Sequence, residues 1–128
     1  MEEKYYSPEL QEFHYDFEYE LFDPVLKRWC KFTFDEQDKL SFIKVNKSRV
    51  KLLDKVDIES LGWKQEHWLQ TENIALTFKK EDYELILWFG EIPTVEITRE
   101  EHDIQFHGEI KNKSELKKLM SQLKIKHE

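Results

Sequence analysis

Residues 12–22 alternate between apolar and polar side chains, and this alternation constrains the fold more than any other feature of the chain. Because successive side chains of a β-strand point to opposite faces, the pattern predicts a strand with one face on a hydrophobic core and the other in water. The apolar positions are Phe13, Tyr15, Phe17, Tyr19 and Leu21, and the polar positions are Glu12, His14, Asp16, Glu18 and Glu20.

A second strand is expected soon after the first. Asp23-Pro24 favours a turn, because proline fixes φ and has no amide donor. Residues 29–34 then alternate again, which places Cys30 in the core beside Phe32. The two segments should therefore form a β-hairpin.

Further strands are expected along most of the remaining chain. Residues 83–89 contain the longest apolar run, so we expect this strand to be central in its sheet and covered on both faces. The expected strands after the hairpin are 40–45, 49–53, 74–78, 83–89, 94–98 and 103–110.

Two helices complete the prediction. A short helix that ends at Leu61 would be capped by Asp54 or Asp57, with Gly62 in the left-handed conformation that often follows a helix. A second helix over residues 114–123 carries one apolar stripe, formed by Leu116, Leu119, Met120 and Leu123.

The fold class that these elements predict is α+β. We expect a mainly antiparallel sheet, made of the hairpin and a meander, with a short middle helix and the C-terminal helix packed on one face. Asn112, followed by Glu115, resembles a capping box for that helix. The length of 128 residues favours a single domain over 1–128, with residues 1–10 as an extended N-terminal arm.

Composition narrows the classes of function. The net charge of −7 argues against a protein that coats nucleic acid, because such proteins neutralise phosphates with a basic surface. Cys30 has no second cysteine to pair with, which favours a reducing compartment. The N-terminus lacks a signal-peptide pattern, and no apolar stretch is long enough to span a membrane. We therefore expect a cytoplasmic protein that binds neither membranes nor nucleic acid directly.

The negative charge is concentrated at the start of the chain. Residues 1–23 hold eight acidic residues and one lysine, a charge of −7, whereas the remainder is neutral. The polar face of the first predicted strand therefore forms an acidic row. Its carboxylates would lie in a line, whereas a metal ion needs convergent ligands, so no metal site is expected. The row is either a solvated strand face or a surface that competes for a basic groove on a partner.

No catalytic motif is recognisable. The five histidines are scattered, Cys30 has no neighbouring histidine, and three separated glycines cannot form a phosphate-binding loop. We therefore expect a non-enzyme without cofactor or catalytic residues, although a hydrolase based on paired carboxylates stays open, because such pairs are defined only in space. Trp63 and Trp68 lie in irregular sequence, where they either contact a partner or cover the ends of the sheet.

Three segments together resemble a known group of proteins. They are residues 5–20 (Tyr5-Tyr6-Ser7-Pro8 with Phe17-Glu18-Tyr19-Glu20), residues 57–63 and residues 106–117. The chain resembles a family of small uncharacterised proteins encoded by phages and mobile elements of Bacteroidetes. The resemblance implies an accessory role, and small acidic proteins of such origin include anti-CRISPR inhibitors.

The functional expectation combines the resemblance with the charge pattern. We expect a non-catalytic binding protein that inhibits a host defence nuclease, such as an RNA-targeting CRISPR effector, by protein–protein contact. The expected contact residues are Glu12, His14, Asp16, Glu18, Glu20, Trp63 and Trp68. The alternative is a structural or accessory protein of a mobile element without inhibitory activity. The sequence leaves the oligomeric state open.

Overall fold

The computed structural model describes residues 3–35, 48–66, 74–100 and 103–126. The chain forms two compact units, Met1–Leu52 and Leu53–Glu128. Each unit has a hydrophobic cluster of its own among these residues. The expectation that residues 1–128 fold as a single domain stays a prediction.

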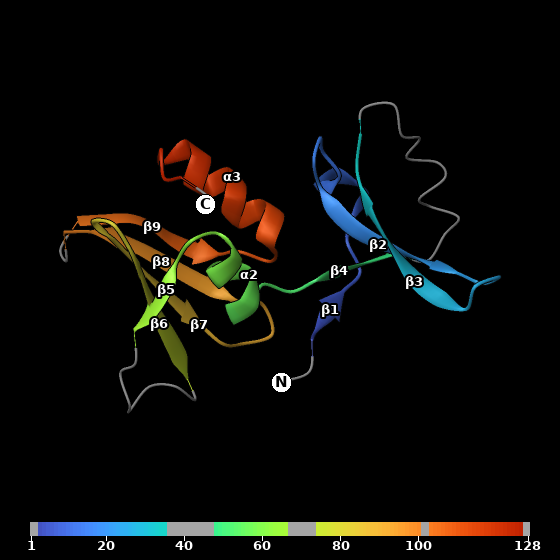
Figure 1. The fold of residues 1–128 in the computed structure, drawn as a ribbon, viewed down its shortest axis with the longest axis horizontal. Helices are drawn as coiled ribbons and strands as arrows, with labels where there is room; N and C mark the ends of the chain where they lie inside the picture. Colours follow the sequence, from blue (N-terminus) through green and yellow to red (C-terminus); the bar gives the residue numbers. More distant parts are fainter. Residues whose placement is uncertain (1–2, 36–47, 67–73, 101–102, 127–128) are drawn as a thin grey trace. The chain divides into compact units, whose positions relative to one another are not determined.

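The first unit contains a four-stranded antiparallel sheet (Figure 1). The strands occur in the order β1-β4-β2-β3, so β1 and β3 lie at the edges of the sheet among the described strands. The predicted hairpin is confirmed, since β2 and β3 pair from Glu18 opposite Thr33 to Asp23 opposite Arg28. The elements are β1 (Tyr5–Tyr6), the 3-10 helix η1 (Leu10–Glu12), β2 (Glu18–Asp23), β3 (Arg28–Thr33) and β4 (Ser48–Lys51).

The predicted strand over residues 12–22 is wrong in its first half. Glu12 ends η1, and Asp16 has a φ of 72°, a left-handed conformation that interrupts a strand. Tyr15 is 69% exposed, although the alternation placed it in the core. Only the segment from Glu18 onward is a strand. The buried cluster consists of Phe13, Phe17, Tyr19, Leu21, Phe34 and Val50.

The N-terminal arm and the strand after the hairpin meet in this sheet. Tyr5 and Tyr6 of the expected arm form β1, which pairs with Lys51 and Val50 of β4. The strand predicted over 49–53 is therefore present as β4. The strand predicted over 40–45 lies outside the described residues.

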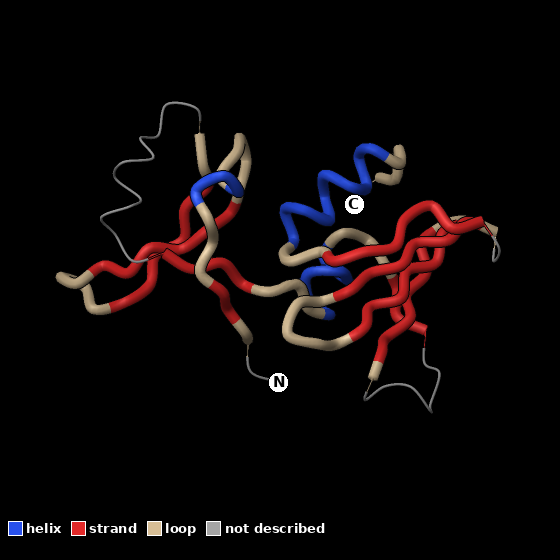
Figure 2. Tube along the Cα trace, turned by 180° about the vertical axis from the view of Figure 1, so that it is seen from behind, coloured by secondary structure: helices blue, strands red, loops and turns tan. Residues whose placement is uncertain are grey.

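The second unit is a five-stranded antiparallel meander with two helices, which confirms the predicted α+β class (Figures 1 and 2). The strands follow one another in sequence order, from β5 at one edge to β9 at the other. The short edge strand β5 was not predicted. The elements are α2 (Lys55–Ser60), β5 (Lys64–Glu66), β6 (Ala75–Lys80), β7 (Tyr83–Trp88), β8 (Thr94–Arg99), β9 (Asp103–Glu109) and α3 (Lys113–Gln122).

The apolar stripe of α3 packs on this sheet, as predicted (Figure 1). Leu116 and Met120 have no exposed surface and share a cluster with Leu85 and Leu87 of β7. Asn112 caps the helix, because its side-chain oxygen accepts a hydrogen bond from the Glu115 amide at 2.8 Å. The stripe therefore fixes which face of α3 meets the sheet.

The middle helix is also present. Asp54, one of the two predicted caps, accepts a hydrogen bond from the Asp57 amide at 3.0 Å. Gly62 has a φ of 95°, the left-handed conformation expected after the helix. Ile58 and Leu61 join the same buried cluster as α3.

Strand β7 is central, as predicted, but the expectation that both of its faces are covered is wrong. Leu85 and Leu87 are fully buried, whereas the alternate residues Ile86 and Trp88 stay partly exposed. The buried residues of α2 and α3 share one cluster with Leu85 and Leu87, and that cluster covers only one side of the strand.

Candidate functional site

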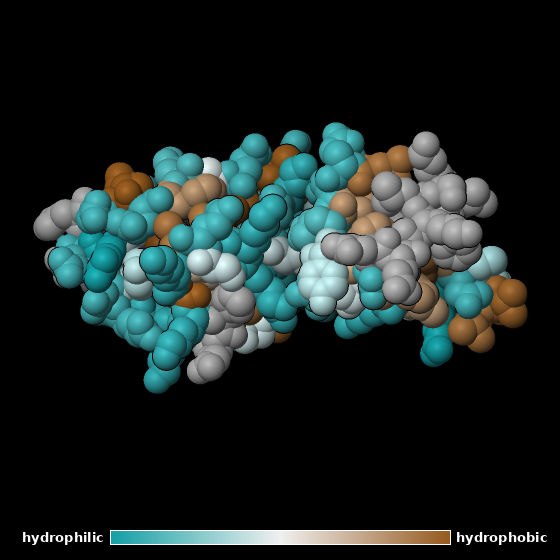
Figure 3. All heavy atoms as spheres, turned by 90° about the horizontal axis from the view of Figure 1, so that it is seen from above, coloured by the Kyte–Doolittle hydropathy of each residue, from teal (hydrophilic) through white to brown (hydrophobic). Residues whose placement is uncertain are grey.

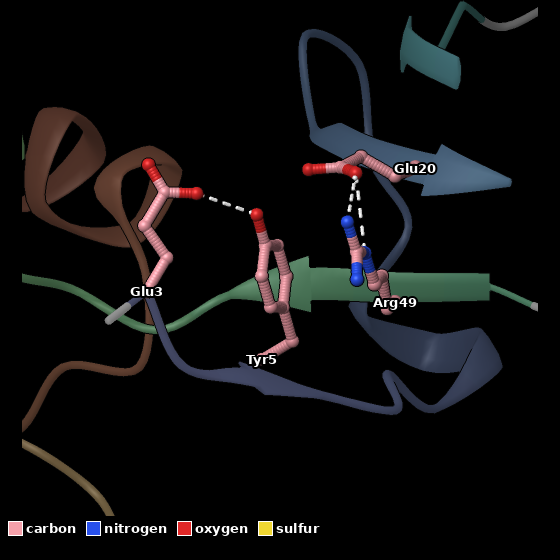
Figure 4. A network of polar contacts seen from close by, with 4 residues as sticks. All are labelled: Glu3, Tyr5, Glu20 and Arg49. Carbon is pink, nitrogen blue, oxygen red and sulfur yellow. Dashed lines mark hydrogen bonds and ion pairs between the residues drawn. The ribbon is translucent and has the colours of Figure 1, made fainter. Parts of the chain in front are cut away.

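A cluster of charged and aromatic side chains lies on one face of the first unit's sheet (Figure 4). Arg49 of β4 faces Glu20 of β2 directly across the strand pair. The Arg49 Nη2 and Nε atoms donate hydrogen bonds to the same Glu20 carboxylate oxygen, at 2.9 and 3.1 Å. The side chains of Arg49 and Glu20 are 26% and 12% exposed, so solvent screens this ion pair only in part.

Two aromatic rings hold the Arg49 guanidinium. Its central carbon lies 3.6 Å from the centre of the Tyr5 ring and 4.2 Å from the Trp29 ring. The guanidinium is attracted by the electron-rich faces of such rings. We refer to Tyr5, Glu20, Trp29 and Arg49 as the Arg49 cluster.

Glu3 fixes the hydroxyl end of Tyr5. The Tyr5 hydroxyl donates a hydrogen bond to a Glu3 carboxylate oxygen at 2.6 Å (Figure 4). This hydrogen bond raises the pKa of Tyr5 above its ordinary value, with smaller contributions from burial and from the negative charge of Glu20. Tyr5 therefore remains a neutral donor throughout the physiological pH range.

The β2–β3 hairpin continues from the Arg49 cluster into an exposed apolar tip. The rings of Phe22 and Trp29 meet edge to face at 5.5 Å between their centres. Beyond them the chain turns at residues 24–27, which we call the hairpin tip, where Val25 is 87% and Leu26 is 55% exposed. Figure 3 shows hydrophobic atoms at this end of the hairpin.

Asp23 organises the hairpin tip. One of its carboxylate oxygens accepts hydrogen bonds from the amides of Val25 and Leu26, at 2.8 and 3.1 Å. Local carboxylate-to-amide bonds of this kind stabilise turns. Two aliphatic side chains are thus presented to solvent on an ordered turn.

The predicted acidic row does not exist as one line. Glu12 lies in η1, where its carboxylate accepts hydrogen bonds from the Tyr6 hydroxyl and the Glu9 amide. The His14 ring is 2.9 Å from the Glu12 carbonyl oxygen. Asp16 lies in the turn before β2. These three residues therefore do not share a strand face with Glu18 and Glu20.

Glu18 and Glu20 alone occupy one face of one strand, as predicted. Glu20 is bonded to Arg49, so its charge is largely neutralised by the neighbouring strand. The prediction of a rigid row of free carboxylates over residues 12–20 is therefore wrong, because the backbone turns before Glu18 and Arg49 pairs with Glu20.

Of the two tryptophans predicted as contact residues, the structure describes only Trp63, and its position differs from expectation. Trp63 is only 2% exposed, and its indole nitrogen donates to the Met120 sulfur at 3.4 Å. It is a core residue of the second unit and cannot contact a partner in the folded protein. Trp68 lies outside the described residues.

The expected core position of Cys30 is wrong as well. Cys30 is half-buried and its neighbour Phe32 is 45% exposed. Both lie on β3, opposite the buried Leu21 and Tyr19 of β2, at the edge of the sheet among the described strands.

A shallow depression of about 530 Å³ lies on the described part of the second unit. Its lining has no histidine, cysteine or serine and consists of Gly62, Lys64, Glu66, Lys79, Lys80 and Glu81. Within the described parts of the chain, no three His, Cys, Asp or Glu side chains gather as a metal site would require. In the same parts, no helix has the length and apolarity to cross a membrane.

Sequence reasoning missed Arg49 and the hairpin tip. The only available signal was the alternation in residues 49–53, which places Arg49 and Lys51 on one strand face. Nothing in the sequence shows that β4 pairs with both β1 and β2.

Comparison with known proteins finds no matching family model, no similar curated protein and no similar solved structure. The resemblance to a mobile-element family therefore stays a prediction, and the geometry of the first unit is the basis for assigning a function.

Proposed function

We propose that the protein is a non-catalytic binding protein that contacts a partner protein through the Arg49 cluster and the hairpin tip. The observation that carries this proposal is the stack of Arg49 on Tyr5 and Trp29 next to the exposed Val25 and Leu26. Tryptophan, tyrosine and arginine are the residues most enriched among those that dominate binding energy at protein interfaces.

The cluster is suited to binding because its side chains are already ordered. Arg49 is held by two rings and by two hydrogen bonds to Glu20, so little rotational freedom remains to be lost when a partner binds. The Arg49 side chain is 26% exposed, so part of it stays accessible to a partner. A rigid aromatic and cationic patch next to an apolar tip is the arrangement typical of an interface centre.

The narrower proposal is that the partner is a host defence nuclease, such as an RNA-targeting CRISPR effector, which the protein inhibits in the host cytoplasm. The resemblance of three segments to mobile-element proteins supports it, and the single cysteine suits a reducing compartment. The acidic row no longer supports this proposal, since Glu12 and Asp16 lie off the strand.

The proposal is tested by recovering a partner with the tagged full chain expressed in bacterial cells. We compare the double variant Val25→Asp/Leu26→Asp with Val56→Asp, whose site is 66% exposed on α2 and outside the proposed surface. We expect a stoichiometric partner that is lost with the double variant and retained with Val56→Asp. Recovery that is equal for both variants would refute the proposed surface.

The inhibitory role needs a separate measurement. The purified chain is added to the recovered partner, and cleavage of RNA and DNA substrates is followed over time. Slower cleavage with the wild-type chain, but not with Val25→Asp/Leu26→Asp, supports the inhibitor. A partner without nuclease activity would favour the accessory alternative.

A further inference from the structure

We propose that two copies of the chain associate through the edge strand β9, so that their five-stranded sheets join into one. This surface lies in the second unit, so the inference goes beyond the proposed function and does not depend on it. It is carried by the open edge of β9, by the pair His107 and Glu109, and by the position of Gly108 between them.

Strand β9 is the last strand of its sheet, and the chain on either side of it is accounted for. After β9, residues 110–112 lead into α3, which packs on a face of the sheet (Figure 1). Before it, Asp103 lies opposite Arg99 of β8, so only residues 100–102 separate the two strands. Among the described strands, β8 alone pairs with β9.

The backbone groups of His107 and Glu109 point away from β8. The Ile110 amide donates a hydrogen bond to the Pro93 carbonyl at 3.0 Å, so these two residues form a hydrogen-bonded pair. Because hydrogen-bonded and non-bonded pairs alternate in antiparallel strands, His107 and Glu109 lie in non-bonded pairs with β8. No described residue bonds to their outward N–H and C=O groups. Such an edge can accept a further strand.

Strand β9 also lacks two features that commonly keep edge strands from pairing. Exposed lysine and proline residues protect many natural edges, and Asp103–Glu109 contains neither. The register of β9 against β8 is irregular only at Ile97/Thr98. Residues 106–110 therefore form a regular segment that is available for pairing.

The exposed side chains of this segment are complementary to each other. Phe106 packs against the cluster that contains α3, so His107 and Glu109 lie on the opposite face. Glu109 faces Thr94 across β8 and forms no hydrogen bond or ion pair with a described residue. Its carboxylate is therefore free to accept a hydrogen bond from a second chain.

His107 supplies the matching donor. Its ring packs against Trp88, with 5.9 Å between the ring centres, and it forms no hydrogen bond with a described residue. Glu96 lies opposite it on β8 without bonding to it. A neutral imidazole has one N–H donor and a protonated one has two, so either form can donate to a carboxylate.

A two-fold axis at Gly108 satisfies both the side chains and the backbone. It places His107 of each copy opposite Glu109 of the other, as a symmetric interface requires. The regular segment 106–110 is centred on Gly108, so it overlaps its own copy completely. An axis at His107 or at Glu109 would pair two imidazoles or two carboxylates, and like charges on paired strands repel.

A basic extended peptide is a poorer occupant of this edge. Glu109 would attract a lysine, but the neighbouring outward residue His107 would repel one when protonated. The second copy matches both positions. Because only five residues pair, the interface is small and the dimer should be weak.

The test is sedimentation equilibrium of the full chain over a range of concentrations. We expect a dimer in the wild type, and we expect His107→Glu to raise its Kd by about tenfold or more, because it places acids opposite each other. His107→Glu/Glu109→Lys restores opposite charges and should return the Kd to within about threefold of the wild type. Circular dichroism verifies that each variant is folded.

The matched control is Lys79→Gln. It lowers the charge by one unit at an exposed site of β6, which β7 and β8 separate from β9. It should leave the Kd unchanged.

Disulfide formation tests the position of the axis, in a Cys30→Ser background that removes the native thiol. Chains with His107→Cys and chains with Glu109→Cys are oxidised separately and as a mixture. Directly opposite residues have Cα atoms about 5.5 Å apart, which suits a disulfide. We expect the mixture to cross-link fastest, whereas faster cross-linking of His107→Cys alone would overturn the axis at Gly108.

Several results would overturn the inference as a whole. One is a wild-type chain that stays monomeric up to about 1 mM, where even weak association is populated. Another is a dimer that His107→Glu leaves intact or that Val25→Asp/Leu26→Asp dissociates, since the latter would place the contact on the first unit. A third is a labelled peptide of Lys-Val-Thr repeats that binds the chain more tightly than the chain binds itself. None of these results decides whether the hairpin tip recovers a partner, so the proposed function is tested separately.

Discussion

Arg49 and Glu20 join two neighbouring strands through one shared oxygen, which accepts hydrogen bonds from two nitrogens of the guanidinium at 2.9 and 3.1 Å. The same guanidinium stacks on the Tyr5 ring of a third strand. One side chain thus connects β4 with β2 and β1.

Replacing Arg49 with alanine should destabilise the first unit by about 2 kcal/mol, because both ring contacts and both hydrogen bonds are lost. Arg49→Lys should recover only part of this loss, since an ammonium cannot stack in the same way. Hydrogen exchange of the β2 and β4 amides measures the effect. Lys4→Ala, at an exposed site of the same unit, is the control and should leave the exchange unchanged.

The stability of the first unit should depend on pH in the alkaline range. The hydrogen bond to Glu3 raises the pKa of Tyr5 above its ordinary 10.0, so the folded chain holds this proton more tightly than the unfolded chain. The stabilisation is complete below about pH 10 and is lost as the pH rises through the raised pKa.

Tyrosine carbon NMR follows the titration, with Tyr5→Phe used to assign the signal. Glu3→Gln should lower the pKa of Tyr5 towards its ordinary value. An unchanged titration in Glu3→Gln would show that the hydrogen bond is not the main cause.

Trp63→Ala should destabilise the second unit by about 3–5 kcal/mol, because a fully enclosed aromatic side chain is replaced by a cavity. Urea denaturation followed by circular dichroism gives the free energy of unfolding. Val56→Ala, at a site that is 66% exposed, is the control and should change it by less than about 0.5 kcal/mol. A Trp63→Ala protein as stable as the wild type would contradict the buried position of Trp63 and favour the surface position expected from the sequence.

Glu81→Gly should stabilise the second unit by up to about 1 kcal/mol. Glu81 has a φ of 54° in the two-residue connection between β6 and β7, a conformation that glycine adopts without strain. The same denaturation experiment measures the gain. Asp82→Gly is the matched control, because Asp82 has no positive φ and should lose stability on substitution.

The helices and the meander could be predicted because their signals are local. The spacing of Leu116, Leu119 and Met120 defines one side of a helix whatever it packs against, and all three are buried. Asp54 and Gly62 likewise act on the residues next to them. Such short-range preferences can be recognised in a single sequence.

The acidic row could not be predicted correctly, because the alternation of apolar residues does not show where the backbone turns, and Tyr15 is exposed against the pattern. Phe13 and Phe17 are buried as the alternation requires, yet they reach the core from a 3-10 helix and a turn. The left-handed Asp16 between them leaves no trace in the pattern of apolar residues.

The Arg49 cluster could not be predicted for a different reason. Its members come from four strands, and the pairing of β4 with β1 and β2 is set by no local turn. Non-local strand pairing is decided by the packing of the whole unit. Trp63 was misplaced in a similar way, since only its contact with Met120 shows that it belongs to the core.

The small hydrophobic cluster of the first unit links partner binding to folding. Six described side chains form this cluster, compared with fifteen in the second unit, and a small core supplies little stability. A partner that binds only the folded first unit would raise its free energy of unfolding by about 2.7 kcal/mol at a hundredfold excess over Kd. Candidate partners can therefore be ranked by the rise in melting temperature that they cause, before any inhibition assay exists.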